Sequence, residues 1–284
     1  MTLVLALLSG TVHAAGKGSP RINTDPMTLV GRTIKNFYVL SAQEAQMLEP
    51  VCVLVLGSGG PGLMWYDAVK GHPILNHPSY NMAQGAISLH HYCYGEVAKN
   101  RRFFETDPKK RAFHVERMLD EYGFVINSTQ YRNKHWPYLK KVLVEYGKAA
   151  LLAKKLPDGI TAFNQALKLD PAYEPAHIAL AEAMLSMGNK DDALAQVTEG
   201  LKRIPESEKL QKRFLDYGGK LPYPEPYPKP AALAETQPTP TETPAPTESA
   251  PSETAPTPPV LNEDEFKIGT VGEDPKRPNC RFCP

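Results

Sequence analysis

The sequence predicts an all-α protein, a short stack of helical hairpins followed by an extended proline-rich tail. Three observations support this fold class. Residues 140–173 and 174–207 resemble each other at a 34-residue offset, apolar residues recur at helical spacing between 86 and 126, and 16 of the 28 prolines lie beyond Leu221. Because a repeat of this length suffices for two helices and their turns, it favours stacked hairpins.

Composition divides the chain into segments of different character. We expect a signal-like segment over 1–15, a loop-rich region over 20–82, a helical domain over 83–219, a disordered linker over 220–262 and a cysteine-containing tail over 263–284.

The chain opens with a short apolar stretch that ends in small residues. Residues 1–15 fit the end of a secretory signal, with cleavage near Ala14 or Ala15. No Lys or Arg precedes Lys17, so the basic start of such a signal is missing. A buried N-terminal helix is the alternative, which Gly10 would keep short. We expect export, to the periplasm of a Gram-negative bacterium or beyond it.

Residues 20–82 contain one pattern that resembles a cofactor site. A short helix is expected over 42–48, and the apolar run 51–56 precedes Gly57-x-Gly59-x-x-Gly62, as a strand precedes a dinucleotide-binding turn. Pro61 lies inside that turn, and Met82 stands where an acidic residue is needed. We therefore interpret the run as an apolar segment and loop packed on the first helices, and expect no cofactor.

Two helices are expected upstream of the repeat. Apolar residues follow helical spacing at Ala86, Leu89, His90, Cys93, Tyr94 and Val97, and again at Ala112, Val115, Met118, Leu119, Tyr122, Val125 and Ile126. Asp107 and Pro108 separate the two runs. We interpret them as a degenerate hairpin, which brings the domain to about three hairpins.

The repeat matches residue size as well as spacing. Small residues fall on small ones and large apolar ones on large apolar ones: Gly147 on Ala181, Gly159 on Ala193, Ala166 on Gly200, Tyr146 on Leu180, Phe163 on Val197 and Leu167 on Leu201. Small residues let the two helices of a hairpin approach closely, and large ones fill the space between successive hairpins. The pattern is what two stacked hairpins need.

Residues 140–205 resemble the tetratricopeptide repeat (TPR) family, whose pattern is W-x2-L-G-x2-Y, then A-x3-F, then P. The first copy reads Leu143-x2-Tyr146-Gly147-x2-Ala150, then Gly159-x3-Phe163, then Pro171; the second reads His177-x2-Leu180-Ala181-x2-Met184, then Ala193-x3-Val197, then Pro205. Neither copy has the Trp, and Lys154 stands where the second copy has the turn glycine Gly188. The resemblance implies a TPR-like solenoid.

The chain changes character after the second copy. Residues 207–217 place Leu210, Phe214 and Tyr217 on one side, as in an amphipathic helix that closes the last hairpin. Beyond Leu221 the chain is dominated by Pro, Thr, Ser, Glu and Ala, which bury too little apolar area to offset backbone ordering. We expect an extended, polyproline-like linker there.

The four cysteines agree with export, because an even number in an oxidising compartment usually means pairing. The disulfide candidates are Cys52, Cys93, Cys280 and Cys283. The simplest pairing joins Cys52 to Cys93 and Cys280 to Cys283, and the other two connectivities stay open. An alternative function follows from the same residues, a thiol–disulfide or metal-dependent factor that uses the Cys280-x-x-Cys283 pair.

Other function classes find little support. The formal net charge of +1 gives no overall positive field for nucleic acid, and no apolar run approaches the ~18 residues of a membrane span. Adjacent histidines such as His90 and His91 point to different faces of a helix, so we interpret them as packing residues rather than metal ligands. We expect no catalytic residue and no metal site.

The TPR resemblance implies protein binding in a groove lined by the first helix of each hairpin. In the family's register the groove residues are Lys141, Val144, Glu145, Lys148, Leu151, Ile178, Ala179, Glu182 and Leu185. They mix charge with aliphatic area, which suits a protein or extended peptide ligand. We expect an exported scaffold or adaptor whose partner is another envelope protein; self-association as a structural stabiliser is a further possibility.

Overall fold

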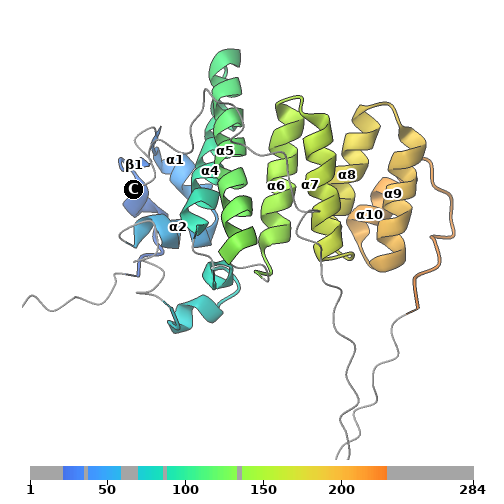
Figure 1. Cartoon of the computed structure of the whole chain (residues 1–284), viewed down its shortest axis with the longest axis horizontal. Helices are drawn as coiled ribbons and strands as arrows, with labels where there is room; N and C mark the ends of the chain where they lie inside the picture. Colours follow the sequence, from blue (N-terminus) through green and yellow to red (C-terminus); the bar gives the residue numbers. More distant parts are fainter. Residues whose placement is uncertain (1–21, 35–37, 59–69, 86–87, 133–135, 229–284) are drawn as a thin grey trace, which may run out of the picture. The chain divides into compact units, whose positions relative to one another are not determined.

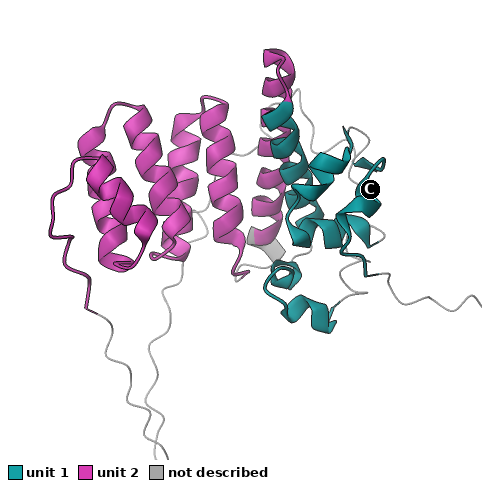
Figure 2. Ribbon diagram, turned by 180° about the vertical axis from the view of Figure 1, so that it is seen from behind, with its two compact units in different colours: residues 1–104 teal, residues 105–284 magenta. Residues whose placement is uncertain are grey.

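The structure is a computed structural model that describes residues 22–34, 38–58, 70–85, 88–132 and 136–228. The signal-like segment, Cys280 and Cys283 lie outside these residues. The chain divides into two units, one ending at Phe104 and one beginning at Glu105 (Figure 2).

The described residues are mostly helical, which confirms the predicted all-α class (Figure 1). Their extended structure in a sheet is limited to two short antiparallel strands, β1 (Thr33–Ile34) and β2 (Tyr38–Val39), in which Thr33 pairs with Val39.

The first unit combines short helices with one longer one. Its helical elements are η1 (Pro26–Leu29), α1 (Ala42–Gln46), α2 (Pro50–Gly57), η2 (Pro73–Asn76), η3 (Asn81–Ala83) and α4 (Leu89–Phe104). The helix expected over 42–48 is confirmed as α1. It begins with a capping box, since the Ser41 hydroxyl accepts from the Glu44 backbone N–H while the Glu44 carboxylate accepts from the Ser41 N–H.

Helix α2 lies at the centre of this unit and contacts η1, η3 and α4. It occupies the apolar run that resembles a strand in the sequence. Pro50 stands at its first position, where a missing N–H costs nothing, and Val51 to Val55 are all buried. Because the run before Gly57 is a helix, the strand–turn–helix context of a dinucleotide site is absent from it.

Two predicted disulfide candidates meet in the first unit. Cys52 on α2 and Cys93 on α4 are both fully buried, with Cα atoms 5.1 Å apart and sulfur atoms 2.16 Å apart. They are 41 residues apart in sequence. The packing of α2 on α4 therefore places Cys52 and Cys93 at disulfide distance, and the pairing of Cys280 with Cys283 stays a prediction.

An ion pair joins α4 to α1. The guanidinium of Arg101 contacts both carboxylate oxygens of Glu44, at 3.0 Å for Nη2 to Oε2, and Nη2 also donates to the Val39 carbonyl at 2.9 Å. Its guanidinium lies 5.5 Å from the centre of the Tyr38 ring. Glu44 is 7% exposed, so Arg101 is the group that compensates a largely buried charge.

The second unit is a stack of antiparallel helices, drawn from green to orange in Figure 1. Its helices are α5 (Pro108–Arg132), α6 (Leu139–Leu152), α7 (Leu156–Leu169), α8 (Glu174–Ser186), α9 (Lys190–Arg203) and α10 (Glu208–Asp216). Each packs against the next, and α6 also contacts α8. The predicted helical-hairpin solenoid is confirmed, with α6 and α7 as the first hairpin and α8 and α9 as the second.

The 34-residue period is visible in the helix boundaries. Helices α7 and α9 begin one period apart, at Leu156 and Lys190, and end one period apart, at Leu169 and Arg203. Helix α10 begins one period after α8. It therefore stands where the first helix of another hairpin would stand.

Close helix contact in the first hairpin depends on glycine. A Cβ added at Gly147 on α6 would lie 2.4 Å from Cε1 of Phe163 on α7, and one at Gly159 would lie 2.9 Å from Cδ2 of Leu151. Phe163 is fully buried by this approach. The predicted role of the small residues is confirmed.

The turns inside the two hairpins have the same backbone conformation. Gly188 has φ of +82°, and Lys154, at the same repeat position, has φ of +60°. A left-handed conformation is routine for glycine but disfavoured for lysine. The repeat geometry therefore outweighs the local preference of Lys154.

Helix α10 closes the apolar core of the second hairpin, as predicted. Leu210, Phe214 and Tyr217 join a buried cluster with residues of α8 and α9, including Val197 and Leu201. The Ser207 hydroxyl caps α10 by accepting from the Leu210 N–H.

Helices also form over the two upstream apolar runs, as α4 and α5, with residues 105–107 between them. They fall in different units. Their pairing as a degenerate hairpin, and with it the domain over 83–219, stays a prediction.

Candidate functional site

The predicted groove residues lie on α6 and α8, which contact each other. We call the side of α6, α8 and α10 that carries these positions the first-helix face. Of the predicted residues, Lys148, Glu182 and Leu185 are exposed, Lys141, Glu145, Leu151 and Ile178 are half-buried, and Val144 and Ala179 are buried.

Burial removes part of the predicted set from any binding role. Val144 is 2% exposed and Ala179 is 4% exposed, so both contact neighbouring side chains instead of a partner. Ile178 packs against the buried cluster of the second hairpin. The family register places these residues on the first helices of the two hairpins, but it takes no account of how far the adjacent helices cover them.

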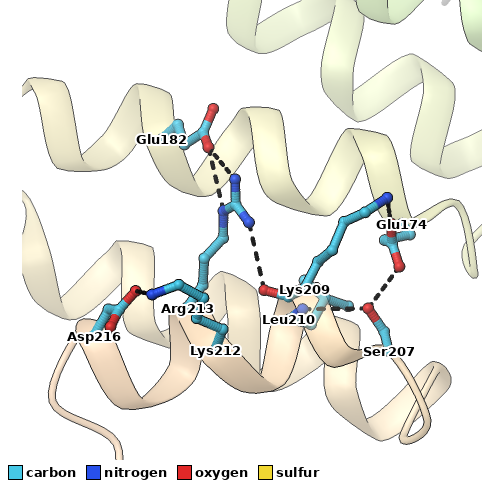
Figure 3. A network of polar contacts seen from close by, with 8 residues as sticks. All are labelled: Glu174, Glu182, Ser207, Lys209, Leu210, Lys212, Arg213 and Asp216. Atoms are coloured by element: carbon cyan, nitrogen blue, oxygen red, sulfur yellow. Dashed lines mark hydrogen bonds and ion pairs between the residues drawn. The ribbon is translucent and has the colours of Figure 1, made fainter.

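The charged residues of the first-helix face pair with one another. Lys148 contacts Glu145 at 2.8 Å, and the Arg213 guanidinium contacts Glu182 at 2.6 Å. At the other end of α8, the Glu174 carboxylate accepts from the Ser207 hydroxyl at 2.6 Å and pairs with Lys209 at 2.9 Å (Figure 3). These contacts, with the apolar cluster, hold α10 in register with α8.

Glu174 is electrostatically adapted to this contact. The Ser207 hydroxyl and the Lys209 ammonium hold the pKa of Glu174 below its ordinary value, because both favour the ionised carboxylate. Lys209 is largely exposed, so the pair is screened by water and contributes little to stability by itself. Such pairs can exchange their partners for those of a ligand at small cost.

Three residues of α10 extend the face beyond the predicted set. Lys212, Arg213 and Asp216 occupy the positions that Ile178, Ala179 and Glu182 hold on α8, and Lys212 pairs with Asp216 at 3.0 Å. A third application of the 34-residue offset would have found them.

A polar pocket of about 600 Å³ lies on the second helices, α7 and α9, and reaches α8 between them. Its lining includes Gln165, Lys168, His177, Gln196, Glu199 and Arg203. Gln165 is 4% exposed, and its Oε1 atom has no hydrogen-bond partner among the described residues. That atom is itself buried, so its missing partner is a cost to the fold.

His177 forms the base of this pocket and is 2% exposed. Its Nε2 lies 2.9 Å from the Pro171 carbonyl, and its Nδ1 lies 2.7 Å from Nε2 of Gln196. The carbonyl only accepts, so Nε2–H donates to it and Nδ1 accepts from the Gln196 amide. This arrangement requires the neutral ring.

Comparison with known proteins agrees with the hairpin geometry. The tetratricopeptide repeat family model matches residues 150–212. These residues are tetratricopeptide repeats. The TPR segment thus spans the end of α6, all of α7, α8 and α9, and the start of α10.

A crystal structure of a thermophilic TPR protein from Thermus thermophilus is also similar, at 21% sequence identity. The match covers 59% of this chain and 79% of that one, with a TM-score of 0.41. Among curated proteins, no match to this chain was found.

The described part of the chain outside the TPR segment presents no arrangement suited to metal chemistry. Within the described residues, no group of three or more His, Cys, Asp or Glu side chains is placed to hold an ion. The rings of His90 and His91 lie tilted by 47° to each other, with centroids 4.4 Å apart, and His91 is the more buried of the two. No described helix is both long and apolar enough to cross a membrane.

The neutral His177 makes the TPR segment sensitive to acid. Burial lowers the pKa of His177 below its ordinary 6.5, the nearby Arg203 acts in the same direction, and the Pro171 bond and Glu199 oppose them. The unfolded chain therefore binds a proton more readily, so stability is full above pH 6.5 and is lost as pH falls below it.

We therefore expect wild-type protein to be less stable at pH 5.5 than at pH 7.5, measured by denaturant unfolding. His177→Gln is expected to reduce this pH dependence. The lowered carboxylate pKa values of Glu174 and Glu199 affect stability only below about 4.5, so they do not interfere. Equal pH dependence in both proteins would contradict the assignment of a neutral His177.

Proposed function

We propose that this protein is an exported, non-catalytic TPR scaffold that binds another protein of the cell envelope through the first-helix face. The stacked equal-length hairpins and the match to the TPR family support the binding role. Export rests on the signal-like sequence of residues 1–15 and on the even number of cysteines.

The chemistry of the first-helix face suggests the kind of partner. Charged side chains of both signs alternate along it, in the pairs Glu145–Lys148 and Glu182–Arg213. The aliphatic side chain of Leu185 on the same face is 39% exposed. A partner segment with its own charges of both signs can replace the intramolecular pairs and cover the aliphatic area. An amphipathic helix or an extended peptide of mixed charge meets both requirements.

Capture of partners from envelope extracts tests this surface. We expect the double variant Lys148→Glu, Leu185→Asp to retain less than a fifth of the partner that wild-type protein retains, because one change reverses a charge and the other removes aliphatic contact. The Lys148 side chain is 49% exposed and Leu185 is 39% exposed, and circular dichroism checks that the variant folds. The matched control is Lys190→Glu, an equally exposed charge reversal at the start of α9. Unchanged capture by the double variant would exclude the face.

We propose further that Cys52 and Cys93 form a disulfide in the exported protein. Their burial and the 5.1 Å separation of their Cα atoms support it. In protein collected from the periplasm and unfolded without reductant, a thiol reagent is expected to label neither cysteine. After reduction both are expected to react, as peptide mass spectrometry resolves. Full labelling before reduction would contradict both the disulfide and the oxidising compartment.

A further inference from the structure

The residues that follow α10 keep contact with the last helices of the stack. Residues 221–228 contain two copies of Pro-Tyr-Pro, centred on Tyr223 and Tyr227 with Glu225 between them. The sequence predicts a disordered linker from residue 220 onward. In the structure, residues 220–228 instead lie against α9 and α10.

Tyr227 contacts three residues of α9 through four different groups. Its backbone N–H donates to the Lys202 carbonyl at 2.8 Å, and its hydroxyl donates to Oε2 of Glu199 at 2.7 Å. Its ring lies 5.7 Å from the Lys202 ammonium and 5.1 Å from the Arg203 guanidinium. The carbonyl belongs to the last turn of α9, where carbonyls have no partner within the helix.

Each of these contacts is specific for a feature of a Pro-Tyr-Pro peptide. The carbonyl recognises an extended backbone, the carboxylate recognises a phenol hydroxyl, and the two cations recognise an aromatic face. Burial alone would raise the pKa of Glu199, but the bonds from Tyr227 and Arg203 outweigh it and keep the carboxylate ionised. Flanking prolines hold a peptide extended before it binds.

The segment occupies the surface loosely. Tyr223 packs its ring on Phe214 with centroids 5.8 Å apart, yet it is 38% exposed, and Tyr227 is 46% exposed. None of the large side chains of the segment enters a buried core. A tether this shallow is in equilibrium with a released state.

The surface continues past the segment into the pocket between α7 and α9. Glu199 and Arg203, which contact Tyr227, also line that pocket. Lys168 and Gln196 belong to the same lining. A peptide longer than the chain's own segment therefore has a further cavity lined by polar side chains within reach.

We propose that the outer side of α9, together with the α7–α9 pocket, is a second binding surface, and that it takes extended peptides containing Pro-Tyr-Pro. Residues 221–228 are its intramolecular occupant and compete with such a peptide. This surface is formed mainly by the second helices of the hairpins, and it shares no named residue with the first-helix face proposed above.

The test uses fluorescence anisotropy with a labelled peptide, LPYPEPYPKP, which copies residues 221–230. In the full chain, Tyr223→Ala, Tyr227→Ala is expected to bind the peptide at least tenfold more tightly than wild type, because a short tether gives the native segment a millimolar effective concentration. Adding Glu199→Ala is expected to weaken this binding about tenfold. The control Glu206→Ala, at an exposed acid outside the pocket lining, is expected to leave it unchanged.

A peptide in which both tyrosines are phenylalanine is expected to bind about tenfold more weakly, because it cannot donate to Glu199. Equal affinity of wild type and the released variant would overturn the proposal, as would binding that does not depend on Glu199. If the double tyrosine variant fails to fold by circular dichroism, Tyr227→Ala alone serves, since Tyr223 then keeps its contact with Phe214.

Discussion

Replacing Gly147 with alanine is expected to lower the free energy of unfolding of the second unit by about 3 kcal/mol. The added Cβ would lie 2.4, 2.8 and 2.9 Å from three atoms of the Phe163 ring, closer than carbon atoms can approach. Phe163 is fully buried, so its ring has no free space to move into. Helices α6 and α7 must then separate. Denaturant unfolding measures the loss, and hydrogen exchange assigns it to α6 and α7.

The repeat itself supplies a compensating change. At the positions of Gly147 and Phe163 the second hairpin has Ala181 and Val197, both buried. The double variant Gly147→Ala, Phe163→Val copies this pair, so it is expected to be more stable than Gly147→Ala alone. The matched control is Gly57→Ala at the end of α2, where a new Cβ meets neighbours only at 3.5 Å or beyond. If the loss of unfolding free energy in the double variant equalled the sum of the losses in Gly147→Ala and Phe163→Val, the steric explanation would be refuted.

Replacing Arg101 with leucine is expected to destabilise the first unit by about 3 kcal/mol, because it leaves the Glu44 carboxylate buried without its cation. Ser41 would remain as the donor to that carboxylate. Lysine at position 101 is expected to fall between wild type and leucine, since an ammonium cannot bond both carboxylate oxygens in parallel. Hydrogen exchange of the α1 and α4 amides measures the loss in this unit.

A second substitution tests whether the loss comes from the uncompensated charge of Glu44 or from the changed packing at position 101. In Arg101→Leu, Glu44→Gln the buried group is a neutral amide, so the double variant is expected to be less destabilised than Arg101→Leu. Arg32→Leu, at an exposed arginine of the same unit, is the matched control and is expected to change stability little. If Arg101→Leu behaved like Arg32→Leu, the ion pair would have no role in holding α1 to α4.

The repeat was the most predictable part of this fold, because it leaves two independent signals in the sequence. The period fixes the helix lengths, and the alternation of sizes at positions such as Gly147 and Phe163 fixes which faces meet. Even the left-handed turn at Lys154 was foreseeable from its alignment with Gly188.

Helix α2 was less predictable for a physical reason. It is buried on all sides, so the residues around Cys52 are uniformly apolar and show no helical period. A strand and a buried helix then have the same pattern, and only the packing on η1, η3 and α4 distinguishes them.

The burial of the predicted groove residues was not predictable. The family register assigns the groove to α6 and α8, which stays a prediction, and the burial of Val144 and Ala179 depends on how closely neighbouring helices approach. The contact of Tyr227 with α9 was not predictable either. The composition of a proline-rich segment shows only that it buries too little apolar area to fold by itself. A few exposed polar contacts do not alter that composition.

Helix α10 has a consequence for the length of the array. It begins in phase with α8, and the described chain that follows it, as far as Pro228, is irregular. Within the described residues the array thus stops after the first helix of a third unit. A helix copied from α9 and placed after α10 would complete that unit, and whole hairpins could then follow it at the same 34-residue period.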